Sequence, residues 1–256
     1  MRKCEMGDGL FEFEIECLQI AEHATPGQFV QVRPAESGNP LLRRPFSIAG
    51  VDGKNLLLLI KQVGQGTSLI CRKECGEHLD VIGPLGQGFP VPCEDKKYLL
   101  VAGGYGIAPF IFFTARHRHA QGEILYGAKT KNEIKFFAGH FSDMTSSGWN
   151  VSCITEEKID GKSGLVTDLL EKDLCIRSEY EAVYACGPVG MLRKVAQIAK
   201  NYNLPCLVSM ESRMGCGFGV CLSCAVPIKT VGTPVYRLAC CDGPVFRSEE
   251  INWEKL

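Results

Sequence analysis

The stretch Tyr98-Leu-Leu-Val-Ala-Gly-Gly-Tyr-Gly-Ile-Ala-Pro109 joins an apolar strand pattern to a glycine-rich turn. The run Tyr98–Ala102 has the length of a buried strand, and a helical pattern follows over Pro109–His119. Strand, glycine turn and helix in this order are the context of a dinucleotide-binding turn. The match to Gly-x-Gly-x-x-Gly is incomplete, because Pro109 stands at the third glycine position and no obvious acidic residue ends the next strand.

Residues 96–211 repeat this alternation of strand, turn and helix. Further strands and helices are expected at Ile124–Tyr126, Val151–Ile154, Leu165–Lys172, Ala182–Cys186, Val189–Asn201 and Cys206–Ser209. The alternation predicts a parallel sheet covered by helices on both faces. Cys186-Gly-Pro188 ends one of these strands and therefore points into the same carboxyl-end crevice as the glycine turn. Cys186 can equally be a packed strand thiol.

Residues before about 95 carry strand and turn signals instead. Phe11, Phe13, Ile15 and Cys17 alternate with glutamates, which is the period of a half-buried antiparallel strand. Other apolar runs are separated by Pro, Gly, Asn and Asp, and they lie at Gln28–Val32, Pro45–Ile48, Leu56–Val63 and Leu79–Ile82. Short strands with turns between them predict a small antiparallel barrel.

Two features of this first region suit a bound anion. Arg44-Pro-Phe-Ser47 offers a guanidinium group, whose planar fork of donors matches a pyrophosphate. Gly64-Gln-Gly-Thr67 opens a short helical segment, Ser68–Lys73, and a helix N-terminus supplies free N–H groups for the same anion. Together they predict an anion cradle, whereas each alone is more often a solvated strand end or an ordinary turn.

The last segment gathers five of the fourteen cysteines. In Cys216-Gly-Phe-Gly-Val-Cys-Leu-Ser-Cys224 the intervals are four residues and then two, with Cys240 and Cys241 downstream. This is the leading spacing of plant-type [2Fe–2S] ligands, in which one loop holds three thiolates and a distant fourth completes the set. The interspersed glycines allow the turns of such a loop and let backbone N–H groups approach the sulfurs.

A zinc-stabilised binding module is the alternative for these thiols. Zinc ribbons use two paired knuckles of cysteines. A second clean knuckle is missing from the sequence, because Cys240 and Cys241 are adjacent. The spacing therefore favours an iron–sulfur cluster over a tetrahedral zinc site or buried free thiols.

The composition argues against several classes of function. The 28 Lys and Arg residues balance 29 Asp and Glu residues, giving a net charge of −1, which is unlike a nucleic-acid or membrane-surface protein. The weakly polar run Val101–Phe113 is too short and too interrupted by Gly and Pro for a membrane span. The start MRKCEMGDGL lacks a signal-peptide pattern. We therefore expect a reducing, cytoplasmic compartment, where clustered cysteines are metal or redox residues.

Taken in order, the motifs resemble the ferredoxin-NADP reductase superfamily, in which a barrel holds FAD and a following α/β domain holds NAD(P)H. The resemblance rests on Arg44-Pro-Phe-Ser47, Gly66-Thr67, Leu79–Gly86, Gly103–Pro109 and Cys186-Gly-Pro188. The tail, with Met214–Cys224 and Cys240-Cys-Asp-Gly-Pro-Val-Phe246, looks like that of the electron-transfer subunits of class 1B dihydroorotate dehydrogenases. This second resemblance runs over nearly the whole chain.

The resemblance implies an FAD-binding barrel over residues 1–95, an NAD-binding α/β domain over 96–211 and a [2Fe–2S] lobe over 212–256. It implies FAD contacts at Arg44, Pro45, Phe46, Ser47, Leu59, Ile60, Lys61, Gly66 and Thr67. It implies nicotinamide nucleotide contacts at Gly103, Gly104, Gly106, Pro109, Cys186, Gly187 and Pro188. The implied cluster ligands are Cys216, Cys221, Cys224 and Cys240, with Cys241 left open as the other choice for the fourth.

The implied activity is electron transfer between NAD and an FMN-containing dihydroorotate dehydrogenase catalytic subunit, through FAD and the cluster, in pyrimidine (UMP) biosynthesis. The family suggests a heterotetramer with two copies of each subunit. The rival is a related NAD(P)H-dependent reductase subunit that serves ferredoxin, a hydrogenase or a sulfur-reducing complex. NADH is favoured over NADPH by resemblance alone. Lys129 and Lys131 are basic residues that can in principle contact a 2′-phosphate, but such residues are more often a solvated strand end.

Overall fold

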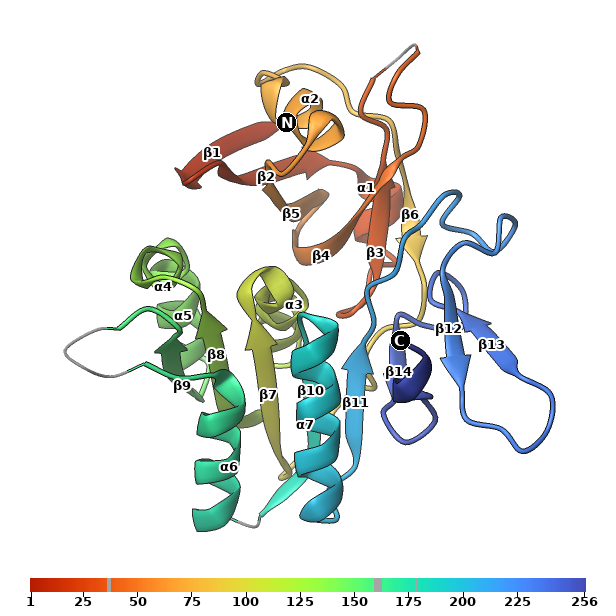
Figure 1. The fold of residues 1–256 in the computed structure, drawn as a ribbon. Coiled ribbons are helices and arrows are strands. Elements are labelled where there is room, and N and C mark those ends of the chain that lie inside the picture. The colour runs from red at the N-terminus through yellow and green to blue at the C-terminus, as the bar shows by residue number, and fades with distance from the viewer. Residues whose placement is uncertain (36–37, 159–162, 178) are drawn as a thin grey trace.

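The computed structural model describes residues 1–35, 38–158, 163–177 and 179–256, and Figure 1 shows their arrangement. The N-terminal part is a six-stranded antiparallel sheet in the order β1-β2-β5-β4-β3-β6, accompanied by two helices. The bounds are β1 Arg2–Gly7, β2 Leu10–Glu16, α1 Leu18–Ala21, β3 Phe29–Val32, β4 Arg44–Asp52, β5 Asn55–Lys61, α2 Gln65–Arg72 and β6 Val81–Leu85. The predicted antiparallel barrel region is confirmed.

The barrel core follows from the alternation along its strands. Phe13 and Ile15 on β2, Val30 and Val32 on β3 and Leu58 on β5 point into one buried cluster. Each fully buried side chain of this size stabilises the fold by about 1.5–3 kcal/mol relative to an exposed one. The glutamates between Phe11 and Cys17 lie at the intervening, more exposed positions of the same strand. Strand β2 is therefore packed on one face, and its glutamates lie on the other.

The second sheet has the order β14-β11-β10-β7-β8-β9, with five parallel strands and β14 antiparallel at one edge. The elements from its first strand in the chain to β9 are β7 Lys97–Gly103, η1 Gly104–Ile107, α3 Ala108–Arg116, β8 Gln121–Ala128, α4 Lys131–Phe136, α5 Ala138–Ser146 and β9 Trp149–Thr155. The remaining elements are α6 Val166–Ile176, β10 Tyr180–Cys186, α7 Val189–Asn201, β11 Cys206–Ser209 and β14 Val245–Arg247.

Helices cover both faces of this sheet, as the sequence predicts. Leu99 and Val101 of β7 share a buried cluster with residues of α6 and α7. Leu100 and Ala102, the alternate residues of the same strand, pack with residues of α3 and α5. Figure 1 shows α6 and α7 on the near side of the sheet and α3 and α5 on the far side. Burial on both faces explains why these strands read as continuous apolar runs.

The C-terminal segment is tied to the second sheet through one strand. After β11 it contains the antiparallel pair β12 Ala225–Ile228 and β13 Val235–Leu238, then returns as β14 and ends in η2 Trp253–Lys255. β14 pairs with β11, so the segment that carries the cysteines completes the edge of the second sheet. Nothing in the sequence pattern indicated this pairing. The domain limits at residues 95/96 and 211/212 stay a prediction.

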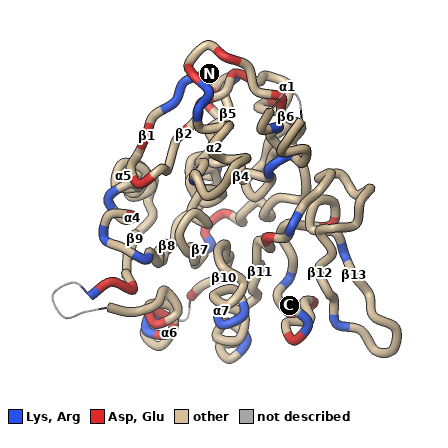
Figure 2. The backbone as a smooth tube through the Cα atoms, turned by 45° about the horizontal axis from the view of Figure 1, so that its top comes forward, with Lys and Arg blue, Asp and Glu red and all other residues tan. Residues whose placement is uncertain are grey.

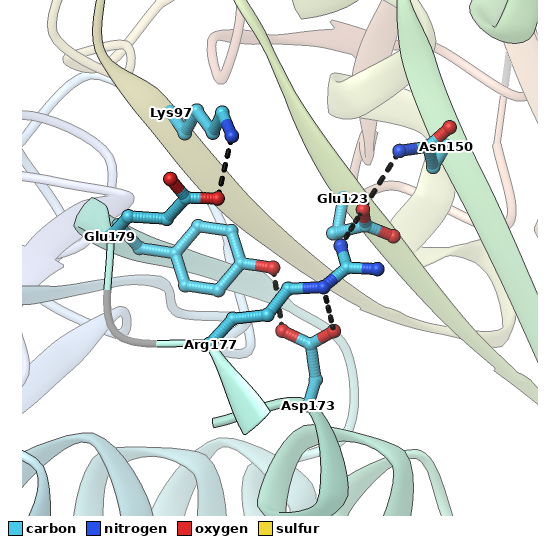
Figure 3. Close-up of polar contacts among 7 residues, drawn as sticks. Lys97, Glu123, Asn150, Asp173, Arg177 and Glu179 are labelled. Atoms are coloured by element: carbon cyan, nitrogen blue, oxygen red, sulfur yellow. Dashed lines mark hydrogen bonds and ion pairs between the residues drawn. The ribbon is translucent and has the colours of Figure 1, made fainter. Parts of the chain in front are cut away.

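Polar side chains gather at the amino ends of the parallel strands, far along the strands from the carboxyl-end crevice. Figure 3 shows Glu123 of β8 between Arg177, at the end of α6, and Asn150 of β9. Asn150 Nδ2 donates to Glu123 Oε1 at 2.8 Å, and the Arg177 guanidinium pairs with the same oxygen. The Tyr180 hydroxyl donates to Asp173 Oδ2 at 2.6 Å. This network ties α6 to three strands.

Replacing Glu123 with glutamine is expected to lower the urea midpoint of unfolding without changing its slope, because the buried amide cannot replace the charge that Arg177 pairs with. The network lies at the opposite sheet edge from the crevice, so the folded variant should bind a crevice ligand as tightly as the unaltered protein. A weaker crevice affinity at unchanged stability would contradict this structural role.

Charge is distributed over the molecule rather than collected on one element. Figure 2 shows Lys and Arg interspersed with Asp and Glu along the described backbone, in keeping with the net charge of −1. Within the described residues, every helix is too short or too polar to cross a bilayer.

Candidate functional site

The glycine turn and Cys186-Gly-Pro188 meet where the strand order reverses. β8 and β9 lie on one side of β7, and β10 and β11 lie on the other, so the boundary between β7 and β10 is the switch point of the sheet. Ala102 is in register with Cys186 across this boundary. The two predicted turns therefore end neighbouring strands and face the same crevice, as expected.

A cavity of 780 Å³ opens at this switch point. Five of the predicted contact residues line it, namely Lys61, Gly103, Gly104, Gly187 and Pro188. The cavity also reaches Lys129 beyond β8 and Lys194 on α7. The cavity extends from the end of barrel strand β5 across the carboxyl edge of the second sheet. Its volume is large enough for a dinucleotide-sized ligand.

Glycine is favoured in these turns because backbone atoms lie close to Gly106 and Gly187, and side chains lie close to Gly103. A Cβ atom on Gly106 would lie 2.2 Å from the carbonyl oxygen of Cys186. A Cβ on Gly103 would lie 2.6 Å from Met191 Sδ, and Gly187 has φ +153 with Gly103 Cα 3.1 Å from its Cβ position. The glycines thus let the two turns touch and keep the floor of the crevice open.

Three of the predicted nucleotide contacts lie beneath the crevice rather than on its wall. Gly106 and Pro109 are buried in η1 and α3, and Cys186 is 2% exposed. Burial raises the pKa of the Cys186 thiol to about 12, so the thiol stays protonated at neutral pH. Cys186 is therefore a packed strand thiol at the base of the site and not a reactive one.

Arg44 and Gly66 come together as the predicted anion cradle. A Cβ on Gly66 would lie 2.7 Å from Arg44 Nε and 3.0 Å from Nη2, so the guanidinium packs flat over the first turn of α2. Its Nη1 donates to the Leu42 carbonyl at 2.7 Å, which fixes the orientation of the group. An arginine fork beside a helix N-terminus is a suitable site for a pyrophosphate.

Thr67 has a different part in this cradle from the one expected. Its Oγ1 accepts from the backbone N–H groups of Val63 at 2.9 Å and Gly64 at 3.0 Å, and it donates to the Gly64 carbonyl at 3.0 Å. The hydroxyl is therefore committed to the turn before α2. Thr67 positions the helix N-terminus, and a phosphate would meet the backbone N–H groups of the first turn.

Replacing Arg44 with alanine is expected to lower the FAD content of the purified protein by roughly tenfold, because it removes a charge-assisted pair of hydrogen bonds to a phosphate. The FAD-to-protein absorbance ratio measures the effect. Arg43→Ala is the matched control, since Arg43 pairs with Asp80 at 2.8 Å instead of covering Gly66. Unchanged FAD content in Arg44→Ala would place the cradle elsewhere.

The remaining predicted flavin residues fall into two groups. Pro45, Phe46 and Ser47 continue along β4 from Arg44 and keep partial exposure. Ile60 is fully buried in the barrel core, and Leu59 packs with the core of the second sheet, so their flavin contacts stay a prediction.

Lys61 stands between the two halves of the molecule. Its Nζ donates to the Asp8 carbonyl and lies 5.9 Å from the centre of the Tyr105 ring, which follows the glycine turn. Because it also lines the cavity, Lys61 connects barrel strand β5 to the crevice of the second sheet.

The four predicted cluster thiols lie as two pairs. The Cys216 backbone N–H donates to Cys221 Sγ at 3.4 Å, and the Cys221 N–H donates to Cys216 Sγ at 3.4 Å. Cys224 Sγ and Cys240 Sγ are 3.2 Å apart and buried. Among the described residues no three His, Cys, Asp or Glu side chains converge on one point. Two pairs are nevertheless the arrangement that a two-iron cluster uses, with two thiolates for each iron.

The loop stabilises thiolate at Cys221. The Ser223 hydroxyl, with the backbone N–H groups of Ser223 and Cys216, lowers the pKa of the Cys221 thiol to about 6. Ligation to iron requires the deprotonated form, so this environment suits a ligand. Burial raises the pKa of Cys240 instead, and a metal is needed to hold that sulfur as a thiolate.

Cys241 lies beside the pairs without completing one. Its Sγ is 3.6 Å from Cys240 Sγ, and it faces Gly219, where a Cβ would lie 2.8 Å from the sulfur. Cys240 is the deeper of the two and the one next to Cys224. Cys240 remains the predicted fourth ligand.

Two residues at the site were missed by sequence reasoning. Glu211 follows β11 and lines the cavity, where it keeps exposed surface while the surrounding protein raises the pKa of its carboxyl by desolvation. Gln31 of β3 is completely buried against the cysteine loop. A polar residue inside the apolar run Phe29-Val-Gln-Val32 was the available signal for the second.

Comparisons with known proteins agree with this geometry. Residues 211–252 match the family model described as the iron-sulfur cluster binding domain of dihydroorotate dehydrogenase B, and residues 100–197 match an oxidoreductase NAD-binding domain. The electron transfer subunit of dihydroorotate dehydrogenase B (NAD(+)) from Desulforamulus reducens is 37% identical over 95% of this chain and 93% of its own length. The Geobacillus kaustophilus subunit is 36% identical over 94% and 92%.

The chain belongs to the dihydroorotate dehydrogenase B electron transfer subunit family. Among solved structures, an NADH-dependent reduced ferredoxin-NADP oxidoreductase matches with a TM-score of 0.84 and 28% identity. The match covers 100% of the present chain and 89% of the oxidoreductase chain. Ferredoxin-NADP+ reductase from Plasmodium falciparum has a TM-score of 0.62 at 20% identity, over 79% and 90% of the two chains, and shows the common fold. The predicted fold class is therefore confirmed.

Proposed function

We propose that this protein carries electrons between NAD and the catalytic subunit of a dihydroorotate dehydrogenase, through bound FAD and a [2Fe–2S] cluster, in pyrimidine (UMP) biosynthesis. The observation that carries the proposal is the arrangement of three sites in sequence: the nucleotide crevice, the anion cradle of the barrel and the paired thiols. Lys61 joins the first to the barrel, and Gln31 joins the barrel to the third.

The residues take distinct parts in this scheme. Arg44 and the first turn of α2 would hold the FAD pyrophosphate, with Ser47 further along β4 toward the second domain. Gly103, Gly104, Gly187 and Pro188 would hold the nicotinamide nucleotide in the crevice. Bound FAD exchanges electron pairs with a nicotinamide and single electrons with an iron–sulfur cluster, and the protein supplies orientation and electrostatics.

The cysteine loop also offers a surface for the catalytic partner. Phe218, Val220 and Leu222 alternate around Cys221 and are 52%, 74% and 62% exposed. Large apolar side chains so exposed around one loop are typical of a protein interface. We propose that this loop faces an FMN-containing catalytic subunit in an assembly with two copies of each chain. Fourteen free thiols suit the reducing cytoplasm as its location.

The alternative is a reductase subunit that serves ferredoxin. It is favoured by one observation, the full-length likeness to the NADH-dependent reduced ferredoxin-NADP oxidoreductase. The greater identity to dihydroorotate dehydrogenase B subunits, over nearly the whole of both chains, favours the pyrimidine role.

Co-expression with the catalytic subunit of the same host tests the proposal. The purified complex should contain FAD, FMN and iron, and it should reduce NAD⁺ with dihydroorotate. The catalytic subunit alone should oxidise dihydroorotate only with an artificial acceptor. A loaded complex that reduces ferredoxin from NADH but leaves NAD⁺ unchanged in the presence of dihydroorotate would establish the alternative.

A further inference from the structure

Gln31 is a buried amide in an apolar setting. It is 0% exposed, and neither its Nε2 nor its Oε1 has a hydrogen-bond partner among the described residues. Its strand neighbours Val30 and Val32 point into the barrel core. Strand alternation therefore turns Gln31 away from that core, on the same face as Phe29, which packs with residues of the C-terminal segment.

The cysteine loop packs directly against this amide. A Cβ atom on Gly217 would lie 2.6 Å from Gln31 Cγ and 2.9 Å from Nε2, so only glycine fits there. Gly217 has φ +88 and follows Cys216, the first predicted cluster ligand. Within the sheet, Gln31 is in register with Pro45 of β4 on one side and with Ile82 of β6 on the other. The side chain thus contacts the loop of the predicted cluster, and its strand lies beside the predicted flavin segment.

A buried amide without partners is costly, because both its donor and its acceptor lose hydrogen bonds to water. An aliphatic residue would fill the same strand position without that cost. The two flanking residues, Val30 and Val32, are aliphatic. The amide therefore indicates a bound polar group at this point. The sulfur-rich centre formed at Cys216 is the group that the loop would bring there.

We propose that Gln31 Nε2 donates a hydrogen bond to the [2Fe–2S] centre at Cys216 and thereby raises the reduction potential of the cluster. This inference rests on the proposed function, since it requires the cluster. Reduction adds negative charge to the cluster, and an N–H donor aimed at sulfur stabilises that charge. Gln31 is a positioning residue on barrel strand β3. Its contact with the cysteine loop would both hold the loop against the barrel and set the reduction potential of the cluster.

Gln31→Leu in the FAD- and iron-loaded protein tests the proposal. The cluster should remain, and its equilibrium constant for reduction should fall about tenfold, which is about 59 mV for a one-electron couple. The FAD potential should stay unchanged. Gln28→Leu is the matched control: Gln28 donates to the Gly86 carbonyl at 2.8 Å and accepts from Thr25 N–H at 2.8 Å, so its loss should reduce thermal stability without moving the cluster potential.

Several results would overturn the proposal. An unchanged cluster potential with raised thermal stability would show that Gln31 is only an unpaired core amide. A shift confined to the flavin potential would assign the amide to FAD. In both cases a normal cluster signal leaves the proposed electron-transfer function standing, whereas a protein that never binds iron fails at the proposed function itself.

A measurement on the unaltered protein covers the case in which Gln31→Leu does not fold. Protein carrying 15N in the glutamine side-chain amide is reduced, and pulsed paramagnetic resonance detects nitrogen coupled to the cluster. A coupling is expected from the Gln31 amide, and Gln31→Met should abolish it where that variant folds. Absence of any side-chain amide coupling at full cluster occupancy would refute the contact.

Discussion

Replacing Cys221 with serine is expected to abolish the paramagnetic signal of the reduced [2Fe–2S] cluster and the dihydroorotate-linked reduction of NAD⁺. Cys221 is one member of the thiol pair with Cys216, and hydrogen bonds from Ser223 and the loop backbone lower the pKa of its thiol to about 6. A serine hydroxyl stays protonated at neutral pH and cannot supply the missing charge. Paramagnetic resonance, iron content and the coupled assay measure the effect.

The same variant separates the two halves of the electron path. The predicted FAD cradle, Arg44 and Gly66, lies in the barrel and away from the thiols, so NADH oxidation with an artificial acceptor should continue in Cys221→Ser. Cys241→Ser is the matched control and should keep its iron, because Cys241 stands outside the two thiol pairs. Loss of iron from Cys241→Ser with retention in Cys240→Ser would transfer the fourth ligand to Cys241.

Replacing Gly106 with alanine is expected to lower kcat/KM for NADH by about a hundredfold, the scale of a displacement of about 1 Å in a positioned site. The added Cβ would lie 2.2 Å from the Cys186 carbonyl oxygen and 2.9 Å from Gly187 N, so the two turns of the crevice must separate. The atoms in conflict are backbone, and a rotamer change cannot relieve the contact. NADH titration and stopped-flow reduction of FAD measure the loss.

Gly139→Ala on α5 is the control for this substitution. No heavy atom beyond its own helix lies within 4 Å of the Cβ position, and the residue is remote from the crevice. Gly139 lies in the first turn of α5, so alanine there should raise stability by at most about 0.5–1 kcal/mol and leave NADH kinetics unchanged. A Gly106→Ala protein with normal NADH affinity and normal stability would show that the two turns can separate without affecting the nucleotide site. Other residues would then form the base of the crevice.

The order of the elements was largely predictable, and the exceptions have identifiable causes. The strands β7, β8, β9, β10 and β11 occur where their apolar runs indicated them. The helices α4 and α5 were not expected, because Lys131–Phe136 and Ala138–Ser146 are short and lack a clear apolar stripe. They form because Phe137 and Phe141 pack on Tyr126 of β8. Tertiary packing here supplies what the local pattern lacks.

The site shows the same division. Sequence spacing indicated the cluster thiols, since short chain intervals constrain which side chains can meet around one ligand, and side-chain chemistry indicated the cradle of Arg44 and Gly66. The family resemblance implied contacts at Ile60 and Thr67, and the structure shows that Ile60 is buried and that the Thr67 hydroxyl is bonded within its own turn, so these contacts stay predictions. Residue type and position in a motif do not reveal which side of a turn faces the ligand.

The sequence by itself determined the fold class, the chemistry of the thiols and the glycines at the crevice, because these depend on local periodicity and on intervals of a few residues. Only the tertiary structure decided that β14 closes the second sheet, that the thiols pair as Cys216 with Cys221 and Cys224 with Cys240, and that Gln31 meets Gly217. Those contacts join segments far apart along the chain. Their partners are selected by the packing of whole sheets against one another, which short-range patterns do not encode.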